Sequence, residues 1–273
     1  DLSSNTNLTG TALRSIAQLL KLERLNLMQC RFNDIHTRRL AKLAELRVLD
    51  LRGNMEAGDL TLAVVGQLPR LAAFKHRSST VTDEGLAALA ASASLESLLI
   101  QDFAITSASG PHLAKLGKLS SLEIFRCQGF GTEGVLALAG LPLARLTLRD
   151  LPDVDDAALA VLEKLPALRR LYLHELAGVG DEGLARLAAA RDLEVLDIWS
   201  LPRMTDATAA VIAGLPNLRE VSIRETGVTE QSLAAIAALP KLESLTFKNG
   251  TVSPDVAARV KAAKACKKLY LGQ

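Results

Sequence analysis

Aromatic residues are scarce in this sequence, where six Phe, two Tyr and one Trp supply only 3% of 273 residues. Hydrophobic residues of all kinds nevertheless reach 49%, with Leu and Ala the commonest among them. A large irregular core relies heavily on aromatic side chains to fill its volume. The composition therefore favours many small, similar packing layers over one large core.

An excess of charge of one sign is also absent. The chain has 32 Lys and Arg against 30 Asp and Glu, which gives a formal net charge of +2. A domain dedicated to nucleic acid normally carries a clear basic excess. The charge balance therefore argues against nucleic acid as the partner.

Cysteine is equally rare. Cys30, Cys127 and Cys266 are odd in number and far apart in the chain, which argues against a disulfide framework and favours a reducing compartment. Uncharged apolar stretches stay shorter than the roughly 18 residues that a membrane span needs. We therefore expect no membrane-spanning helix.

A repeat of 24 or 25 residues accounts for the whole sequence. Each copy opens with the pattern L-x-x-L-x-L, and Leu2 marks a partial copy before the first full one. Internal periods of this length are typical of solenoids, so we expect residues 1–273 to form a single domain. The copies begin at Leu22, Leu46, Leu71, Leu95, Leu119, Leu143, Leu168, Leu193, Leu218, Leu242 and Cys266.

Within a copy, apolar and polar residues first alternate, as in a short strand, and then recur at helical spacing after a capping residue. Parallel strands stack about 4.8 Å apart, whereas packed helices need about 10 Å. The array must therefore curve. The pattern predicts an α/β solenoid, a right-handed horseshoe with a parallel sheet on its concave face and helices on its convex face.

Residues 81–90 read V-T-D-E-G-L-A-A-L-A and residues 183–188 read G-L-A-R-L-A. These copies resemble the leucine-rich repeats of bacterial GALA-type effectors. Cys30 and Cys127 occupy the position where the cysteine-containing leucine-rich repeats of F-box adaptors carry a Cys. The resemblance implies a target-recognition arm of an effector or ubiquitin-ligase adaptor, located in the cytoplasm or delivered into a host cell.

The two ends of the sequence lead to different expectations about how far the repeat array continues in the full-length protein. The chain opens at Asp1, without Met and inside a repeat, so we expect a fragment of a longer protein. Residues 263–268 replace the usual Leu-Pro entry to a strand with small and charged residues. This replacement predicts a terminal, capping copy at the natural end of the array.

Several patterns resemble chemical sites but have simpler explanations. Residues 178–183 read G-V-G-D-E-G and match a dinucleotide-binding pattern, yet Asp181 and Glu182 place negative charge where a pyrophosphate would lie. Asp153, Asp155 and Asp156 precede a helix, where carboxylates cap free N–H groups. We therefore predict neither a cofactor nor a metal ion.

The four histidines, His36, His76, His112 and His174, lie in different copies without a second ligand nearby in sequence. His76 occupies a core position, where a buried polar group needs a hydrogen-bond partner. No nucleophile motif accompanies any of them. The sequence predicts a binding protein and not an enzyme.

The binding surface should lie at positions 3, 5 and 7 of each copy, which alternate with the core residues and face the hollow. In the middle copies these positions carry Arg and aromatic residues, the residue types enriched among interface anchors. The predicted protein-binding residues are Arg145, Arg149, Arg170, Tyr172, His174, Asp197, Trp199 and Arg224.

Three alternatives stay open for this surface. The same arginines could bind an anionic ligand or a nucleic-acid backbone, although acids such as Asp150 and Glu225 interrupt them. Trp199 could simply stack on Arg224 and support the sheet. The whole array could also be a structural spacer.

The copies beside the surface have 25 residues and carry Leu where others carry Cys or Asn, at Leu151, Leu176 and Leu201.

Overall fold

The computed structural model describes residues 1–263 and 266–272. The chain divides into two compact units, unit 1 at Asp1–Pro142 and unit 2 at Leu143–Gln273. Each unit repeats one motif, a short strand followed by a helical return, and each strand pairs in parallel with the next one in sequence. That residues 1–273 fold as one domain stays a prediction.

Unit 1 contains the strands β1 (Arg24–Asn26), β2 (Val48–Asp50), β3 (Ala73–Arg77), β4 (Ser97–Gln101) and β5 (Ser121–Phe125). Its α-helices are α1 (Gly10–Ile16), α2 (Asp34–Thr37), α3 (Asp59–Gly66), α4 (Asp83–Leu89), α5 (Gly110–Leu113) and α6 (Thr132–Leu136). Short 3₁₀ helices extend two of the returns, at η1 (Arg38–Lys42) and η2 (Ser107–Ser109).

Unit 2 contains β6 (Arg145–Arg149), β7 (Arg170–His174), β8 (Val195–Leu201), β9 (Glu220–Thr226), β10 (Ser244–Lys248) and β11 (Lys268–Leu271). Its α-helices are α7 (Asp181–Leu184), α8 (Asp206–Ala213), α9 (Leu233–Ala237) and α10 (Pro254–Lys261). Its 3₁₀ helices are η3 (Asp156–Lys164), η4 (Ala185–Ala189) and η5 (Glu230–Ser232). The predicted terminal copy includes residues 264 and 265, which lie outside the described residues.

The helical returns are partly 3₁₀ and not wholly α-helical, as η3 shows by filling its entire return. A 3₁₀ helix rises about 2.0 Å per residue against 1.5 Å for an α-helix. Fewer residues therefore cover the same length, which suits returns that must fit a period of 24 or 25 residues. None of the described helices is both long and apolar enough to cross a membrane.

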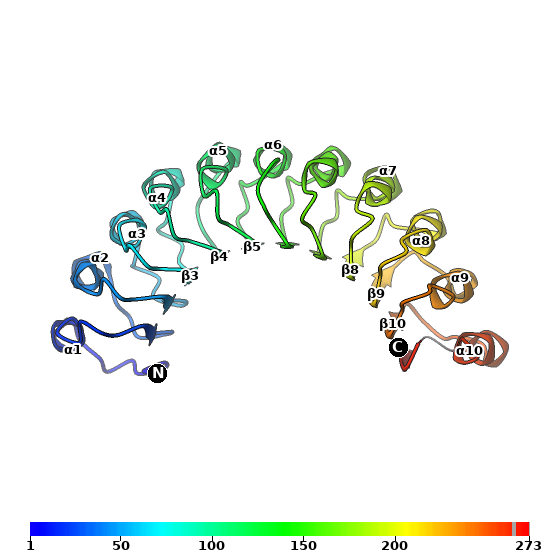
Figure 1. Cartoon of the computed structure of the whole chain (residues 1–273), viewed down its shortest axis with the longest axis horizontal. Coiled ribbons are helices and arrows are strands. Elements are labelled where there is room, and N and C mark those ends of the chain that lie inside the picture. The colour runs from blue at the N-terminus through cyan, green and yellow to red at the C-terminus, as the bar shows by residue number, and fades with distance from the viewer. Residues whose placement is uncertain (264–265, 273) are drawn as a thin grey trace. The chain divides into compact units, whose positions relative to one another are not determined.

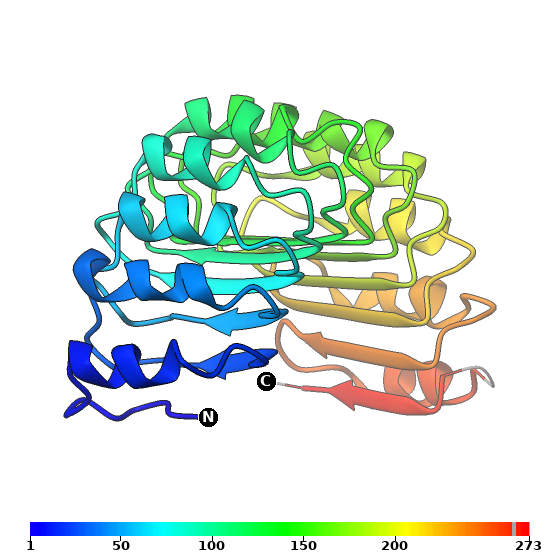
Figure 2. The same cartoon turned by 60° about the vertical axis from the view of Figure 1, so that its left-hand side comes forward.

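In each unit the strands form one layer and the helices cover one of its faces (Figure 1; Figure 2). We call the uncovered face the strand face. Alternate residues of a strand point to opposite faces, and the burial pattern follows this rule. In β7, for example, Leu171 and Leu173 are fully buried under the helices, while Tyr172 and His174 stay partly exposed.

The core of each unit consists of the leucine positions of the repeat. Leu122 and Ile124 in unit 1, like Leu196 and Ile198 in unit 2, have no exposed surface. Burying one such side chain contributes roughly 1.5–3 kcal/mol before the entropy cost of ordering it. The predicted α/β leucine-rich repeat solenoid is confirmed.

A ladder of carboxylates joins successive helical returns. Asp59 on α3 accepts hydrogen bonds from the backbone N and hydroxyl of Thr82, each at 2.7 Å, and Thr82 in turn caps α4. In unit 2, Asp181 on α7 accepts from the backbone N and hydroxyl of Thr205, at 2.9 and 2.6 Å. First-turn acids therefore stabilise the helix of the next copy as well as their own.

Candidate functional site

Strand register brings the predicted residues together on the strand face of unit 2. One row across β6 to β9 contains Arg149, His174, Trp199 and Arg224, each paired in register with the next. The row beside it places Tyr172 next to Asp197. Neighbouring parallel strands lie about 4.8 Å apart, so long side chains in these rows must touch. We call this set, with Arg145, the Trp199 cluster.

The aromatic rings of the Trp199 cluster contact each other edge to face. The His174 ring centroid lies 5.8 Å from that of Trp199 and 6.2 Å from that of Tyr172, at interplanar angles of 72° and 89°. Edge-to-face pairs at such separations are attractive, because the positive ring edge meets the negative ring face. The three rings form one continuous aromatic surface on the strand face.

Arginine side chains pack against these rings. The guanidinium carbon of Arg145 lies 4.6 Å from the centroid of Tyr172. Those of Arg149 and Arg224 lie 5.1 and 5.6 Å from the centroid of Trp199. All three distances fall within the range of a cation–π interaction. The stacking of Trp199 with Arg224 that the sequence suggested is therefore present, with Arg149 as a second partner.

Two of these arginines are also paired with carboxylates. Nε of Arg149 donates to Glu175 at 2.8 Å. Nη2 of Arg224 donates to both oxygens of Asp197, at 2.9 and 3.2 Å. Burial alone would raise the pKa of Asp197, but His174 and Arg224 beside it hold that pKa below its ordinary value. Asp197 is thus an anion at neutral pH, and its hydrogen bonds hold the Arg224 side chain in place on the strand face.

Some polar atoms of this surface are buried yet lack a hydrogen-bond partner. They include Nε of Arg224, Nε2 of His174 and the hydroxyl of Thr147, which lies beside Tyr172 in register. Nε2 of His174 lies 3.5 Å from Asp197, too far for a good hydrogen bond. Buried polar groups are normally satisfied, so this face has unused hydrogen-bonding capacity.

Seven of the eight predicted residues join this contact network, and Arg170 does not. Arg170 pairs with Arg145 in register, is exposed, and makes no ion pair or ring contact with any residue in the described part of the chain. Glu175 and Thr147 were not predicted as site residues. Glu175 follows His174 directly and has a φ of 54°, so its place beside Arg149 depends on a left-handed turn that the sequence does not reveal.

The glycines of residues 178–183 serve packing between copies. A Cβ on Gly178 would lie 2.5 Å from the carbonyl oxygen of Val154, and one on Gly183 would lie 2.7 Å from Cα of Asp156. The space that these glycines leave is thus filled by the preceding copy. Packing between copies therefore accounts for the glycines of this pattern.

Two of the three acidic residues near the start of η3 cap helical returns, Asp155 as the N-cap of η3 and Asp156, its first residue, at the next copy. Asp155 accepts from the backbone N of Ala157 at 3.0 Å, as expected for an N-cap. Asp156 accepts instead from the backbone N atoms of Gly180 and Gly183 in the next copy, at 2.6 and 3.1 Å. Within residues 1–263 and 266–272, no group of three or more His, Cys, Asp or Glu side chains could hold a metal ion.

His76 is a core histidine with a hydrogen-bond partner, as predicted. It is fully buried, with Nδ1 3.1 Å from the carbonyl oxygen of Leu51 and Nε2 2.7 Å from that of Ala57. Burial lowers the pKa of its ring, against the smaller opposite effect of the two carbonyls. A neutral ring therefore fits the site best, donating across the shorter separation to Ala57.

The leucines of the 25-residue copies are core residues. Leu151, Leu176 and Leu201 have no exposed surface. In unit 1, the corresponding Asn54 donates to the carbonyl oxygens of Leu27 and Leu51 at 2.9 and 2.8 Å. These three copies of unit 2 thus carry an apolar side chain where Asn54 carries a hydrogen-bonding one, as the sequence suggested.

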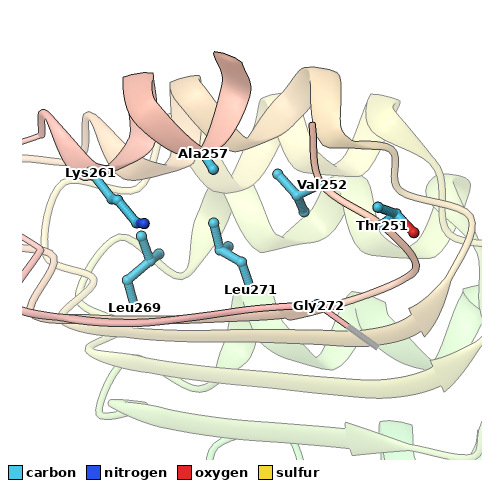
Figure 3. Close-up of a pocket in the computed structure, with 7 residues that line it drawn as sticks. All are labelled: Thr251, Val252, Ala257, Lys261, Leu269, Leu271 and Gly272. Carbon is cyan, nitrogen blue, oxygen red and sulfur yellow. The ribbon is translucent and has the colours of Figure 1, made fainter. Parts of the chain in front are cut away.

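A hollow of about 440 Å³ lies between α10 and β11 in unit 2 (Figure 3). Leu269 and Leu271 point into it from the strand side, and Val252 and Ala257 face them, with Lys261 at one end. Most of these side chains are apolar and occupy core positions of the repeat. The hollow therefore has few polar or charged groups that could bind a ligand specifically, and the Trp199 cluster is the better candidate site.

Comparisons with known proteins agree with this architecture. The structure resembles one chain of the complex of Rad7 and Elc1 from yeast, with a TM-score of 0.61, 19% identity, and coverage of 95% of this chain and 77% of that one. It also resembles an internalin, inlF, from Listeria monocytogenes, with a TM-score of 0.59, 15% identity, and coverage of 100% and 90%. At these identities the likeness concerns the fold alone.

A search of curated proteins gave no significant match. A family model described as a leucine-rich repeat region, however, matches residues 1–270. The match spans nearly the whole chain and agrees with the observed repeat of strand and helical return. The chain therefore belongs to the leucine-rich repeat region family.

Proposed function

We propose that the strand face of unit 2 binds another protein and that the Trp199 cluster anchors the contact. The observation that carries this proposal is the continuous surface of Tyr172, His174 and Trp199 with arginines packed on its rings. Trp, Tyr and Arg are the residues most enriched among energetic anchors of protein interfaces. Binding, and not catalysis, is the proposed activity.

The charge arrangement favours a protein over a polyanion. Arg149 and Arg224 already pair with Glu175 and Asp197, so much of their charge is neutralised before any ligand arrives. A site for phosphate or a nucleic-acid backbone would leave such arginines unpaired. Affinity for the partner should therefore fall only weakly as salt is raised, whereas a polyanion site would show a steep loss.

The unsatisfied polar atoms support the same proposal. Nε of Arg224 and Nε2 of His174 are buried without a partner. A docked protein that shifts these two side chains would expose the atoms to its own polar groups, pair with them and recover free energy that their burial costs. A structural spacer needs neither the aromatic surface nor this unused hydrogen-bonding capacity.

Trp199→Ala tests the proposal. The ring is partly exposed on the strand face, so we expect the variant to lose about 1 kcal/mol of stability or less. Binding should weaken by about 2 kcal/mol, roughly 30-fold, because an interface anchor is lost. Lys248→Ala is the matched control, since Lys248 occupies the same row on β10, next to Arg224 and outside the cluster.

The measurement is affinity capture from a lysate of the source cells, with thermal unfolding of each variant in parallel. Loss of the captured proteins with Trp199→Ala, and retention with Lys248→Ala, would support the proposal. If the Trp199→Ala protein melts like the wild type and keeps all partners, the site lies elsewhere.

A narrower function stays a prediction, namely the target-recognition arm of a bacterial effector or of a ubiquitin-ligase adaptor. Support comes from the effector-like repeats at residues 81–90 and 183–188 and from the fold shared with a chain of the Rad7 and Elc1 complex. The full-length gene tests it directly. An F-box, a ligase module or a secretion signal beside this array would support it, and flanking sequence of another class would contradict it.

A further inference from the structure

A second surface, on the helix side of unit 1, departs from the pattern of the other copies. The second residue after the N-cap of each helical return is small or polar in most copies, for example Glu84, Glu133 and Glu182. In two adjacent copies it is Ile35 and Leu60 instead. These side chains are 62% and 68% exposed, so they do not serve the core.

Ile35 and Leu60 border a hollow of about 450 Å³ between the helical returns of their copies. Ala41 and Ala63 also line it, and their small side chains let an incoming group approach both helices closely. Val64 and Gln67 complete the side formed by α3. Because residues three or four positions apart form a ridge on a helix, two such ridges leave a groove between them. We call this the Ile35–Leu60 groove.

The charges around the groove are basic and unpaired. Arg38 lines the groove, Lys42 lies one turn further along the same return, and both side chains are exposed. Neither makes an ion pair with a described residue. The one acid of the lining, Asp34, is already used, because it accepts hydrogen bonds from the backbone N atoms of Gly58 and Thr61 at 2.8 and 2.9 Å.

We propose that the Ile35–Leu60 groove docks an amphipathic helix of a partner protein, with leucine-like side chains on one face and carboxylates beside them. A helix is the fitting conformation, because the walls are themselves helices whose backbone groups are mostly paired and offer little to an extended strand. The apolar side chains would fill the hollow, and the carboxylates would pair with Arg38 and Lys42.

A second copy of this chain is a poorer occupant. Two-fold pairing through the same surface would bring Arg38 and Lys42 of one copy towards the same residues of the other, because such an interface is self-complementary. Like charges brought together would oppose that association. The inference concerns unit 1 and goes beyond the proposed role of the Trp199 cluster in unit 2.

The test is selection from a display library of helical peptides, with apolar residues fixed at one face and the flanking positions randomised. Selected peptides should carry an excess of Asp and Glu beside the apolar face. Ile35→Glu with Leu60→Glu should weaken their binding at least about tenfold, while leaving the helices intact, since Glu occurs at this position in other copies. Ala157→Glu with Ala207→Glu is the matched control, with the same charge change at the same helix position in unit 2.

A charge exchange separates the two parts of the proposal. Arg38→Glu with Lys42→Glu should weaken binding of the acidic peptides, and replacing their carboxylates with Lys should restore it. The proposal is overturned if no helical peptide is enriched more on the wild type than on the Ile35→Glu, Leu60→Glu variant. It is also overturned if the peptides that the wild type selects are basic. It is also overturned if ultracentrifugation shows a dimer that this double variant abolishes, which would make a second copy the occupant.

Discussion

Asp181 provides a sharp test of how the copies of unit 2 support each other. One of its oxygens accepts from the backbone N atoms of Thr205 and Thr208, at 2.9 and 3.2 Å, and from the hydroxyl of Thr208. Its other oxygen accepts from the hydroxyl of Thr205 at 2.6 Å. Thr208 is only 1% exposed, so water cannot easily replace the carboxylate there.

Asp181→Ala should destabilise the protein by about 2–4 kcal/mol. The backbone N of Thr208 keeps a bond to the carbonyl of Thr205 at 3.1 Å, and the exposed groups of Thr205 can bond to water. The main loss is the charged partner of the buried Thr208 hydroxyl, and such a hydrogen bond is worth roughly 1.5–3 kcal/mol. The lost charge at the N-terminus of α7 adds about 0.3–1 kcal/mol.

Asp181→Asn should cost less than about 1 kcal/mol, because the amide oxygen can accept the same three bonds and the amide nitrogen can donate to Thr205. The assay is urea unfolding at several pH values. Burial alone would raise the pKa of Asp181, but its hydrogen bonds to Thr205 and Thr208 hold it below the ordinary value of 3.8. A lowered pKa means that its stabilising effect is present above pH 3.8 and is lost below it as the group protonates.

The difference between wild type and Asp181→Asn should therefore be largest near neutral pH and shrink as the pH falls below 3.8. Equal stability of Asp181→Ala and the wild type at neutral pH would refute the reasoning. It would show that contacts between leucines, and not the carboxylate ladder, hold neighbouring returns together.

Two further predictions concern residues packed between copies. His76→Phe should lower the free energy of unfolding by about 1–3 kcal/mol, because it leaves the buried carbonyl of Ala57 without its donor. Since burial lowers the pKa of His76, the stability of the wild type should fall as the pH drops below 6.5. Urea unfolding of both proteins should show that this part of the pH dependence is lost in the variant. Gly178→Ala should lower the melting temperature, because its Cβ would lie 2.5 Å from the carbonyl oxygen of Val154. Gly117→Ala is the control and should not lower it, because a Cβ at Gly117 would have nothing within 4 Å. Equal melting temperatures of the two variants would contradict the close packing at Gly178.

The repeat made much of this fold predictable from the sequence. Leu196 and Ile198 follow the core spacing and are fully buried, and Trp199 lies between His174 and Arg224 in register, as expected. One period places every strand, so a single alignment of the copies assigns both faces of the sheet.

Other features depend on side-chain conformation, which the repeat does not determine. Glu175 reaches Arg149 from a left-handed turn. Arg145 stacks on Tyr172, whereas Arg170 beside it stays outside the network. The Ile35–Leu60 groove was not predicted, because it lies between two helical returns and depends on how their side chains pack, although Ile35 and Leu60 depart from the repeat in the sequence.

Site-specific photo-crosslinking tests the central claim, protein binding by the strand face of unit 2, most directly. A photoreactive residue at Ser222, beside Asp197 in register on β9, should form a covalent adduct with the captured partner, and Trp199→Ala should diminish that adduct. The same group at Ala207, exposed on α8, should form none. Adducts from Ala207 but not from Ser222 would contradict the account and place the partner on the helices.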